Sequence, residues 1–312
     1  MTTVPLGAGP EFDRIRAIAA VLGDAAAGLG DDCATLADGW RASTDLAVEG
    51  VHFRREWLAA EEIGWRAAMA ALSDLAAAGA SAEAILVALA VPADEPASTL
   101  TAVMRGIGEA ASAVGAKVVG GDLSSGSGMA ITVTVLGKAA WPIGRRGANP
   151  GDELWVTGTL GGARAAWRAW EAGQVPNPAA RRRFAHPMAR IAEGRLLAKG
   201  GATAMVDLSD GLGGDAGHLA RASGVGLEIE LRLVPIDGSV GGDQRAIEAA
   251  SGGEDYELLV ALPVGAGAAI AQQLLKTTGT MLTRIGQVVA GAQVRFLHQG
   301  STVALVGFNH FR

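Results

Sequence analysis

Residues 141–151 read Trp-Pro-Ile-Gly-Arg-Arg-Gly-Ala-Asn-Pro-Gly, and this stretch divides the chain. Prolines and glycines at this density interrupt helices and strands alike, so the stretch predicts a junction between domains. The chain has 312 residues, which is enough for two domains of ordinary size. We therefore predict an N-terminal domain over residues 1–140 and a C-terminal domain over residues 141–312.

Strands and helices alternate on both sides of this junction. On the N-terminal side, apolar runs predict strands at 40–48, 84–91, 117–119 and 129–137, and Ala-rich segments predict helices at 61–78 and 98–114. On the C-terminal side we expect helices from Gly161, over 212–222 and over 266–276, and strands at 153–157, 203–208, 226–231, 256–262, 284–287, 293–297 and 302–305. The predicted fold class is α/β of the α+β type, with one mixed α/β domain in each half.

The composition excludes several classes of protein. Lys and Arg total 26 against 32 Asp and Glu, so the chain has no excess positive charge for a nucleic-acid backbone. The single cysteine, Cys33, excludes an intrachain disulfide framework and fits a reducing compartment, so we expect a cytoplasmic protein. The longest apolar runs, 84–91 and 129–136, are shorter than the roughly 18 residues of a membrane span. We therefore expect neither a nucleic acid nor a membrane as partner.

Aspartates recur where a predicted strand ends or a glycine turn begins. They occur in Gly30-Asp31-Asp32, Ser43-Thr44-Asp45, Ser73-Asp74, Gly120-Gly121-Asp122 and Asp207-Leu208-Ser209-Asp210-Gly211. Short carboxylates in such turns are the oxygen ligands that Mg²⁺ prefers. Aspartate is also a common N-cap and turn residue, so each cluster alone has an ordinary structural explanation. Asp74 is the most informative, because alanines flank it at helical spacing and a carboxylate on such a face needs a cation beside it.

Several aspartates together indicate several Mg²⁺ ions around a polyphosphate. Mg²⁺ takes one or two carboxylates and fills its other positions with water and phosphate oxygens. An ordinary P-loop is excluded, because Gly137-Lys138 is followed by Ala139. Residues 211–216 match a dinucleotide-binding fingerprint only loosely, and the histidines lack the spacing of a zinc site. The pattern therefore favours a nucleotide bound through magnesium.

Further segments complete an ordered series along the whole chain. They are residues 30–34, 43–53, 73–80, 120–122, 207–212, Gly252-Gly253-Glu254-Asp255-Tyr256-Glu257-Leu258 and Gly307-Phe308-Asn309-His310-Phe311. Together they resemble the thiamine-monophosphate kinase family, which belongs to the aminoimidazole-ribonucleotide synthetase superfamily. The chain departs from the family pattern at Ala71, Leu123 and Asn309, where asparagine, threonine and aspartate are usual.

The resemblance implies a two-domain subunit that forms a homodimer through its N-terminal halves. It also implies ATP as co-substrate, several Mg²⁺ ions, and direct in-line transfer of the γ-phosphoryl group to thiamine phosphate, which gives thiamine diphosphate. A phosphate monoester is already largely anionic at neutral pH, so positioning and charge screening would matter more than a general base. Two alternatives stay open: another ATP-using member of the superfamily, or a non-catalytic sensor of Mg-ATP and thiamine phosphate.

The resemblance implies roles for individual residues as well. Asp45 and Asp210 are the expected catalytic residues, acting through magnesium. The expected metal ligands are Asp31, Ser43, Thr44, Asp45, Asp74, Asp122, Asp207 and Asp210. ATP is expected at Gly121, Asp122, Arg145 and Ser209, with Arg146 as an open alternative to Arg145, and thiamine phosphate is expected at His52, Glu254 and Phe308. We interpret Cys33 as a packing residue.

Overall fold

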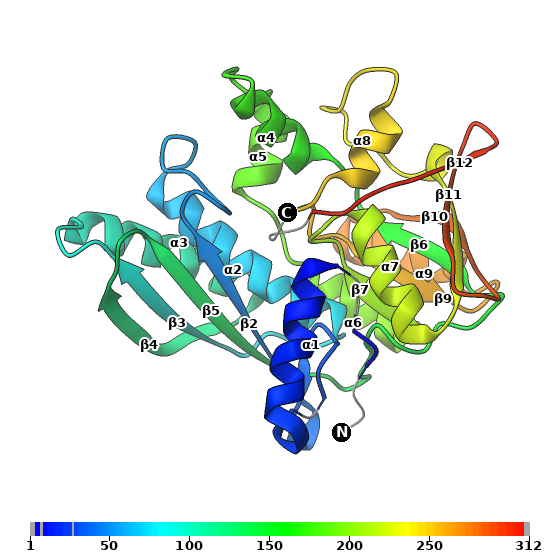
Figure 1. The fold of residues 1–312 in the computed structure, drawn as a ribbon, viewed down its shortest axis with the longest axis horizontal. Helices are drawn as coiled ribbons and strands as arrows, with labels where there is room; N and C mark the ends of the chain where they lie inside the picture. Colours follow the sequence, from blue (N-terminus) through cyan, green and yellow to red (C-terminus); the bar gives the residue numbers. More distant parts are fainter. Residues whose placement is uncertain (1–3, 7–8, 27, 309–312) are drawn as a thin grey trace.

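The structure is a computed structural model that describes residues 4–6, 9–26 and 28–308, and two mixed sheets lie side by side in it (Figure 1). The N-terminal sheet contains β1 (Ala34–Thr35), β2 (Trp40–Val48), β3 (Ala84–Val91), β4 (Lys117–Ser125) and β5 (Ala130–Lys138). Its spatial order is β1-β2-β5-β3-β4, and only the β3–β4 pair among its ladders in the described residues is parallel.

The C-terminal sheet contains β6 (Glu153–Thr157), β7 (Ala204–Asp207), β8 (Gly226–Glu230), β9 (Leu258–Leu262), β10 (Leu282–Val289), β11 (Val294–His298) and β12 (Ser301–Val303). Its spatial order is β12-β11-β8-β10-β6-β9-β7, and β8 and β11 run parallel. Each half of the chain therefore has its own mixed sheet, so the expectation of two mixed α/β domains is confirmed.

Helices α2 (Ala60–Ala77) and α3 (Ala97–Val114) cover one face of the N-terminal sheet (Figure 1). Side chains alternate along each strand, so Ile131, Val133 and Val135 of β5 are buried against these helices. The opposite face, called the outer face below, carries Leu46 and Leu86, which are 52% and 38% exposed. This sheet is therefore packed on one side, while apolar side chains remain exposed on the other.

Helices α2 and α3 approach each other closely at two glycines. A Cβ added at Gly106 would lie 1.9 Å from the carbonyl oxygen of Glu61, and one added at Gly64 would lie 2.0 Å from that of Val103. No real Cβ atom tolerates such contacts with backbone. The helices can pack at this distance only because both positions lack a side chain.

Gly106→Ala is therefore expected to lower the free energy of unfolding by about 1–3 kcal/mol, because the two helix backbones must separate. Gly108→Ala is the matched control, since it lies on the same helix and a Cβ there meets nothing within 4 Å. That variant should keep or raise stability, by up to about 1 kcal/mol, through the higher helix propensity of alanine. Urea unfolding measures both variants, and equal stabilities would contradict the close approach.

The C-terminal sheet has helices on both faces. The core on one face contains Leu259 and Ala261 of β9 with α7 (Leu212–Ser223) and α8 (Arg245–Ser251). The core on the other face contains Leu258 and Val260 with α6 (Ile191–Lys199) and α9 (Gly267–Thr278), and it continues without interruption into α2. Helix α2 therefore belongs to the N-terminal domain and also packs against the C-terminal one.

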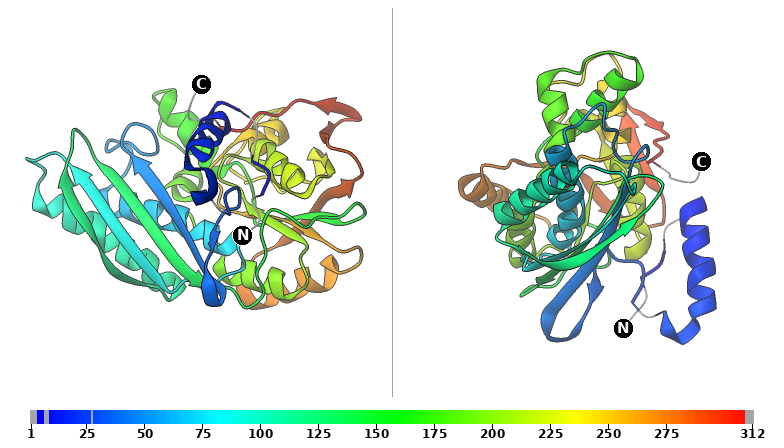
Figure 2. Two further views of the ribbon diagram at one scale, coloured as in Figure 1. Left: turned by 60° about the horizontal axis from the view of Figure 1, so that its bottom comes forward. Right: turned by 90° about the vertical axis from the view of Figure 1, so that its left-hand side faces the viewer.

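The remaining helices lie nearer the domain junction. They are α1 (Pro10–Leu22), α4 (Gly162–Glu171) and α5 (Pro178–Ala185). One-turn 3₁₀ helices lie at Gly23–Ala25, Ala37–Gly39 and Leu231–Leu233. Helix α1 has no buried residue, and it lies beside the region where the two halves meet (Figure 2).

Most predicted elements agree with the structure to within a few residues, and the stretch 141–151 is irregular. The largest disagreement among the predicted strands is β4, which we expected to end at residue 119 and which continues to Ser125. Gly120-Gly121-Asp122 therefore lies within an edge strand and not in a turn. Helices α1, α5, α6 and α8 were not predicted.

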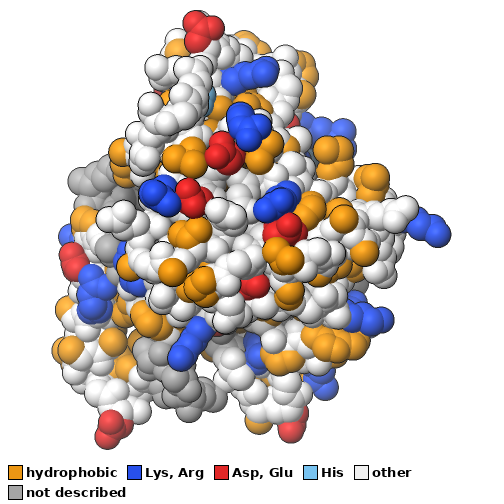
Figure 3. Space-filling model, turned by 90° about the vertical axis from the view of Figure 1, so that its right-hand side faces the viewer, with side chains coloured by type: hydrophobic (Ala, Val, Ile, Leu, Met, Phe, Trp, Pro, Cys, Tyr) orange, Lys and Arg blue, Asp and Glu red, His pale blue; other side chains and the backbone are white. Residues whose placement is uncertain are grey.

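The surface shown in Figure 3 carries Lys, Arg, Asp and Glu side chains interspersed with hydrophobic ones. Among the helices of the described residues, none is both long enough and apolar enough to cross a membrane.

Candidate functional site

A pocket of about 870 Å³ lies between the two domains. Its walls come from the end of β2, from α2, from the turn after β7, from the start of α7 and from the loop at 252–256. It brings together residues that are far apart in the sequence. The predicted site residues that line it are Asp31, Asp45, His52, Asp74, Arg145, Asp207, Ser209, Asp210, Glu254 and Phe308.

Three carboxylates form a tight group in this pocket: Asp32, Asp74 and Asp207. One oxygen of each lies within 4.8 Å of the others. The hydroxyl of Ser43 donates a hydrogen bond to Asp74 at 2.5 Å, and that of Ser73 donates to Asp207 at 2.7 Å. Ser43 therefore belongs to the group through Asp74. Asp74 therefore lies beside Ser43 and other carboxylates, and the cation that we expected there stays a prediction.

The electrostatics of this group favour a bound cation. Burial, together with the charge of Asp32, raises the pKa of Asp207 to about 8. Burial also raises the pKa of Asp32 to about 6, although Arg145 opposes the change. The pKa of Asp74 is raised well above its usual range by burial and by the charges of Asp45 and Asp207. Buried carboxylates this close repel one another when ionised, and a divalent cation removes that repulsion.

The donor set fits Mg²⁺. All three side chains offer carboxylate oxygens, which are the hard ligands that this ion prefers. In addition, Asp32 Oδ2 is buried and has no hydrogen-bond partner among the described residues. A buried carboxylate oxygen without a partner is unfavourable unless a cation meets it. The residues present could therefore hold the ion that the sequence analysis expected.

Asp31 lies outside the carboxylate group, although we expected it among the metal ligands. Its Oδ1 accepts hydrogen bonds from the backbone N–H groups of Asp32 and Arg145, both at 3.0 Å. Asp32, which was not predicted, takes the inner position, and the Nε of Arg145 donates to its Oδ1 at 2.8 Å. The geometry therefore favours Asp32 over Asp31 as a metal ligand. It also places Arg145 in the large pocket, whereas Arg146 lines a smaller one.

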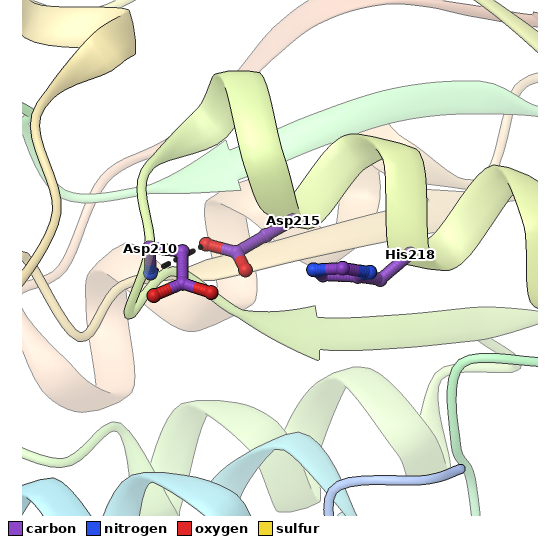
Figure 4. Close-up of side chains that lie close together, drawn as sticks. All are labelled: Asp210, Asp215 and His218. Atoms are coloured by element: carbon purple, nitrogen blue, oxygen red, sulfur yellow. Dashed lines mark hydrogen bonds between the residues drawn. The ribbon is translucent and has the colours of Figure 1, made fainter. Parts of the chain in front are cut away.

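A second group contains Asp210, Asp215 and His218, whose nearest oxygen and nitrogen atoms also lie within 4.8 Å of one another (Figure 4). Asp215 accepts a hydrogen bond from the backbone N–H of Asp210 at 3.1 Å. Burial and the charge of Asp210 raise the pKa of Asp215 well above its usual range. Burial lowers the pKa of His218 to about 4, so its ring is neutral at pH 7. Asp210 was predicted, but its two neighbours on α7 were not.

Thr44, Gly121 and Asp122 do not join these groups within one chain. The Thr44 hydroxyl shares a 2.7 Å hydrogen bond with that of Thr134 on the outer face. Asp122 pairs with Ala88 on the edge strand β4, and the strands β3 and β5 separate it from β2. Three strand spacings put Asp122 about 14 Å from β2. Gly121 has a structural reason to be glycine, because a Cβ there would lie 1.7 Å from the carbonyl oxygen of Val87.

His52 and Phe308 line the pocket from opposite ends of the chain. The Nδ1 of His52 accepts a hydrogen bond from the backbone N–H of Val48 at 3.0 Å, so the neutral ring carries its proton on Nε2. The backbone N–H of Phe308 donates to the carbonyl of Asp210 at 3.0 Å. This bond holds the C-terminal segment beside the turn that carries Asp210. The rest of the terminal motif, Asn309 to Phe311, lies outside the described residues.

Glu254 is held in a strained loop. Its φ is 72° and that of Tyr256 is 51°, which is the left-handed region that residues other than glycine rarely adopt. The backbone N–H of Glu254 donates to the carbonyl of Ser209 at 2.8 Å, and that of Tyr256 donates to the carbonyl of Leu208 at 3.0 Å. The loop at 252–256 is therefore fastened to the aspartate-bearing turn at 207–211.

Arg66 joins α2 to this loop. It forms an ion pair with Glu254, and its Nη1 donates to the carbonyl of Phe184 at 2.6 Å. Its guanidinium carbon lies 3.8 Å from the centroid of the Phe184 ring. Arg66 was not predicted as a site residue from the sequence. Its position in the sequence could have indicated a role, because Arg66 is a cation on a face of α2 that is otherwise apolar and buried.

Known proteins resemble both halves of the chain. Residues 30–139 match the family described as AIR synthase related protein, N-terminal domain, and residues 149–299 match the corresponding C-terminal domain family. A thiamine-monophosphate kinase of Mycobacterium tuberculosis H37Rv is 35% identical over 260 residues, which are 77% of this chain and 76% of that one. The enzyme of that name from Escherichia coli K12 is 33% identical over 320 residues, which are 96% and 95% of the two chains.

A solved structure described as AaThiL complexed with AMPPCP and TMP has the same fold. It superposes on this chain with a TM-score of 0.87 at 31% identity, and the match covers 100% of both chains.

Proposed function

We propose, from the premise that this chain belongs to the thiamine-monophosphate kinases of the AIR synthase-related family, that it transfers the γ-phosphoryl group of ATP directly to thiamine phosphate and forms thiamine diphosphate. A thiamine-monophosphate kinase is a phosphotransferase that uses ATP. One observation carries the finer proposal: the interdomain pocket brings buried carboxylates together with Arg145, Ser209, His52, Glu254 and Phe308. ATP as donor agrees with the cytoplasmic location that we infer.

In this mechanism the charged side chains of the pocket have different roles. Asp32, Asp74 and Asp207 would hold Mg²⁺, and Asp45 and Asp210 would add negative charge that attracts further cations to the pocket. When bound by these residues, the ion would neutralise charge on the two phosphate groups, which otherwise repel each other. Arg145 is held in place by Asp32, and its cationic group faces the pocket in which we place ATP. The acceptor phosphate is already anionic at neutral pH, so no residue needs to remove a proton from it.

Phe308 offers an aromatic face to the substrate, whose flat thiazolium ring carries a positive charge. Cations are attracted to the faces of aromatic rings, most strongly where water is excluded. Phe308 is 46% exposed, which leaves part of its side chain accessible to a substrate. We therefore assign it to the thiamine end of the acceptor.

An ADP-release assay tests the proposal. Magnesium-dependent ADP formation is expected with thiamine phosphate and not with free thiamine, and the product should be thiamine diphosphate. Binding of ATP and thiamine phosphate without ADP formation would support the sensor instead. ADP formation at the same rate with and without thiamine phosphate or thiamine would favour another activity of the superfamily.

Arg66→Met is expected to raise the KM for thiamine phosphate by about 10- to 100-fold, because Glu254 would lose the partner that fixes it and its loop would be less ordered. The KM for ATP should change much less, since Arg66 contacts the Glu254 side of the pocket. Arg66→Lys should restore part of the loss. Steady-state kinetics with each substrate varied separately provide the measurement.

Arg105→Met is the control for Arg66→Met, because Arg105 forms an exposed ion pair with Glu61 on the neighbouring helix. It should leave both KM values unchanged, as exposed ion pairs contribute little. If folded Arg66→Met had the KM of the wild type for thiamine phosphate, the positioning role of Arg66 would be wrong.

We further propose that the outer face of the N-terminal sheet forms a homodimer. All nine residues of the edge strand β4 are exposed, and Leu46 and Leu86 are exposed on the outer face. Unpaired edge strands and exposed apolar faces are features that a second chain covers. Pairing through this face would also explain why Asp122 is remote from Asp45 within one chain. In the dimer, Asp122 of each chain would serve the pocket of the other.

Mixed dimers test this arrangement. Asp45→Asn and Asp122→Asn chains are each expected to be nearly inactive alone. Refolding them together in equal amounts should restore about a quarter of the wild-type activity, because half of the dimers would be mixed and each would hold one intact site. Absence of rescue from chains that do exchange would contradict the sharing of Asp122 between subunits.

A further inference from the structure

A second pocket, of about 220 Å³, lies on the far side of the segment that carries Asp31 and Cys33. Arg41 and Arg146 line it, together with Thr35 and Thr203. Arg41 comes from β2, and Arg146 comes from the irregular stretch between the domains. Asp31 lines both pockets, whereas neither arginine lines the large interdomain one.

Arg41 is a buried arginine at the wall of this pocket. It is 7% exposed, and its Nη1 donates a hydrogen bond of 3.3 Å to the carbonyl of the neighbouring Trp40. Within the part of the chain that the structure describes, no carboxylate lies within 4.0 Å of its guanidinium nitrogens. Buried arginines are almost always paired, since a guanidinium withdrawn from water is costly without an anion. None of the described carboxylates is close enough to Arg41 to be that anion.

The charged side chains in the lining of this pocket are two arginines and one aspartate. Arg146 is exposed at the pocket wall and adds a second guanidinium. Asp31 is the acidic residue in the lining, but its Oδ1 already accepts two backbone hydrogen bonds. The lining therefore carries two positive charges against one negative charge.

We propose that this pocket binds a small tetrahedral oxyanion of the phosphate class, with Arg41 as its buried anchor and Arg146 at its rim. Guanidinium groups present several N–H donors in a plane and bind phosphate oxygens through charge-assisted hydrogen bonds. The Thr35 hydroxyl at the wall offers a further donor. The site is distinct from the one that we assign to ATP and thiamine phosphate, and it does not depend on phosphoryl transfer.

Titration calorimetry of the full-length protein with inorganic phosphate tests this site. The buffer contains EDTA and little salt, because without divalent cations the acidic interdomain pocket repels anions and high salt screens the arginines. We expect saturable binding of one phosphate per chain, with sulfate as a competitor. Arg41→Met should weaken binding by at least about tenfold, and Arg146→Gln by about three- to tenfold, as charge-assisted hydrogen bonds are lost.

Arg182→Gln is the matched control, because Arg182 is exposed on α5 and lies outside this pocket. It should bind phosphate as the wild type does. If Arg41→Met does not fold, Arg146→Gln decides the question, since its side chain is on the surface. Absence of saturable phosphate binding by the wild type would overturn the proposal, and so would unchanged binding by both pocket variants.

Discussion

Asp45→Asn and Asp210→Asn are each expected to lower kcat with thiamine phosphate by roughly 10³-fold or more, because each removes a charge that balances cations beside the transferred group. Asparagine keeps the size of the side chain and one carbonyl oxygen, so packing should survive. Both residues line the interdomain pocket, and both lie beside buried carboxylates: Asp45 raises the pKa of Asp74, and Asp210 raises that of Asp215. ADP release and circular dichroism of the same preparations provide the measurement.

Asp94→Asn is the control for these two variants. Asp94 is exposed and follows β3 at a distance from the pocket lining, so its substitution should leave kcat unchanged. Loss of activity without loss of structure in Asp45→Asn and Asp210→Asn is the expected pattern. Near-normal turnover in either variant would remove that residue from the mechanism.

The fold was predictable where burial imposes a period on the sequence. Strand β2 has the predicted bounds, Trp40–Val48, and α2 begins and ends one residue from its predicted bounds. Both elements are packed on one side. Their apolar residues therefore recur with the two-residue period of a strand in β2 and with the 3.6-residue period of a helix in α2. Helix α1 was missed because it has no buried residue and therefore no such repeat. Strand β4 was cut short because its glycines indicated a turn, whereas the partner strand β3 holds them in extended conformation.

The candidate site was predictable in its chemistry and less so in its geometry. Adjacent Asp31 and Asp32 lie in one turn, and nothing in their spacing says which carboxylate points inward. Asp215 and His218 are three residues apart on α7, which puts them on one helical face, but such a pair is common without function. The ion pair of Arg66 with Glu254 joins residues from different domains. Only the packing of the two halves brings such partners together.

Without metal, the protein is expected to lose stability as the pH rises from about 5 to 8, and Mg²⁺ should reverse the loss. Burial raises the pKa of Asp32 to about 6 and that of Asp207 to about 8, whereas an aspartate in the unfolded chain titrates near 4. Below pH 4 Asp32 and Asp207 are protonated in both the folded and the unfolded protein, so they do not change the free energy of unfolding with pH. Between pH 4 and the raised pKa of each group, the folded state retains a proton that the unfolded state has released. Each group therefore lowers the free energy of unfolding by up to about 1.4 kcal/mol per pH unit in that range.

Mg²⁺ binds the ionised carboxylates and competes with those protons, so its stabilising effect should grow with pH. Thermal unfolding at pH 5 and pH 8, with EDTA or with excess Mg²⁺, measures both effects. Asp255 also has a raised pKa through burial, so it contributes to the pH dependence but not to the Mg²⁺ effect. Asp207→Asn should therefore reduce the Mg²⁺ effect at pH 8, while Asp94→Asn should retain it. Equal stabilisation by Mg²⁺ at both pH values would mean that the buried carboxylates do not hold the ion.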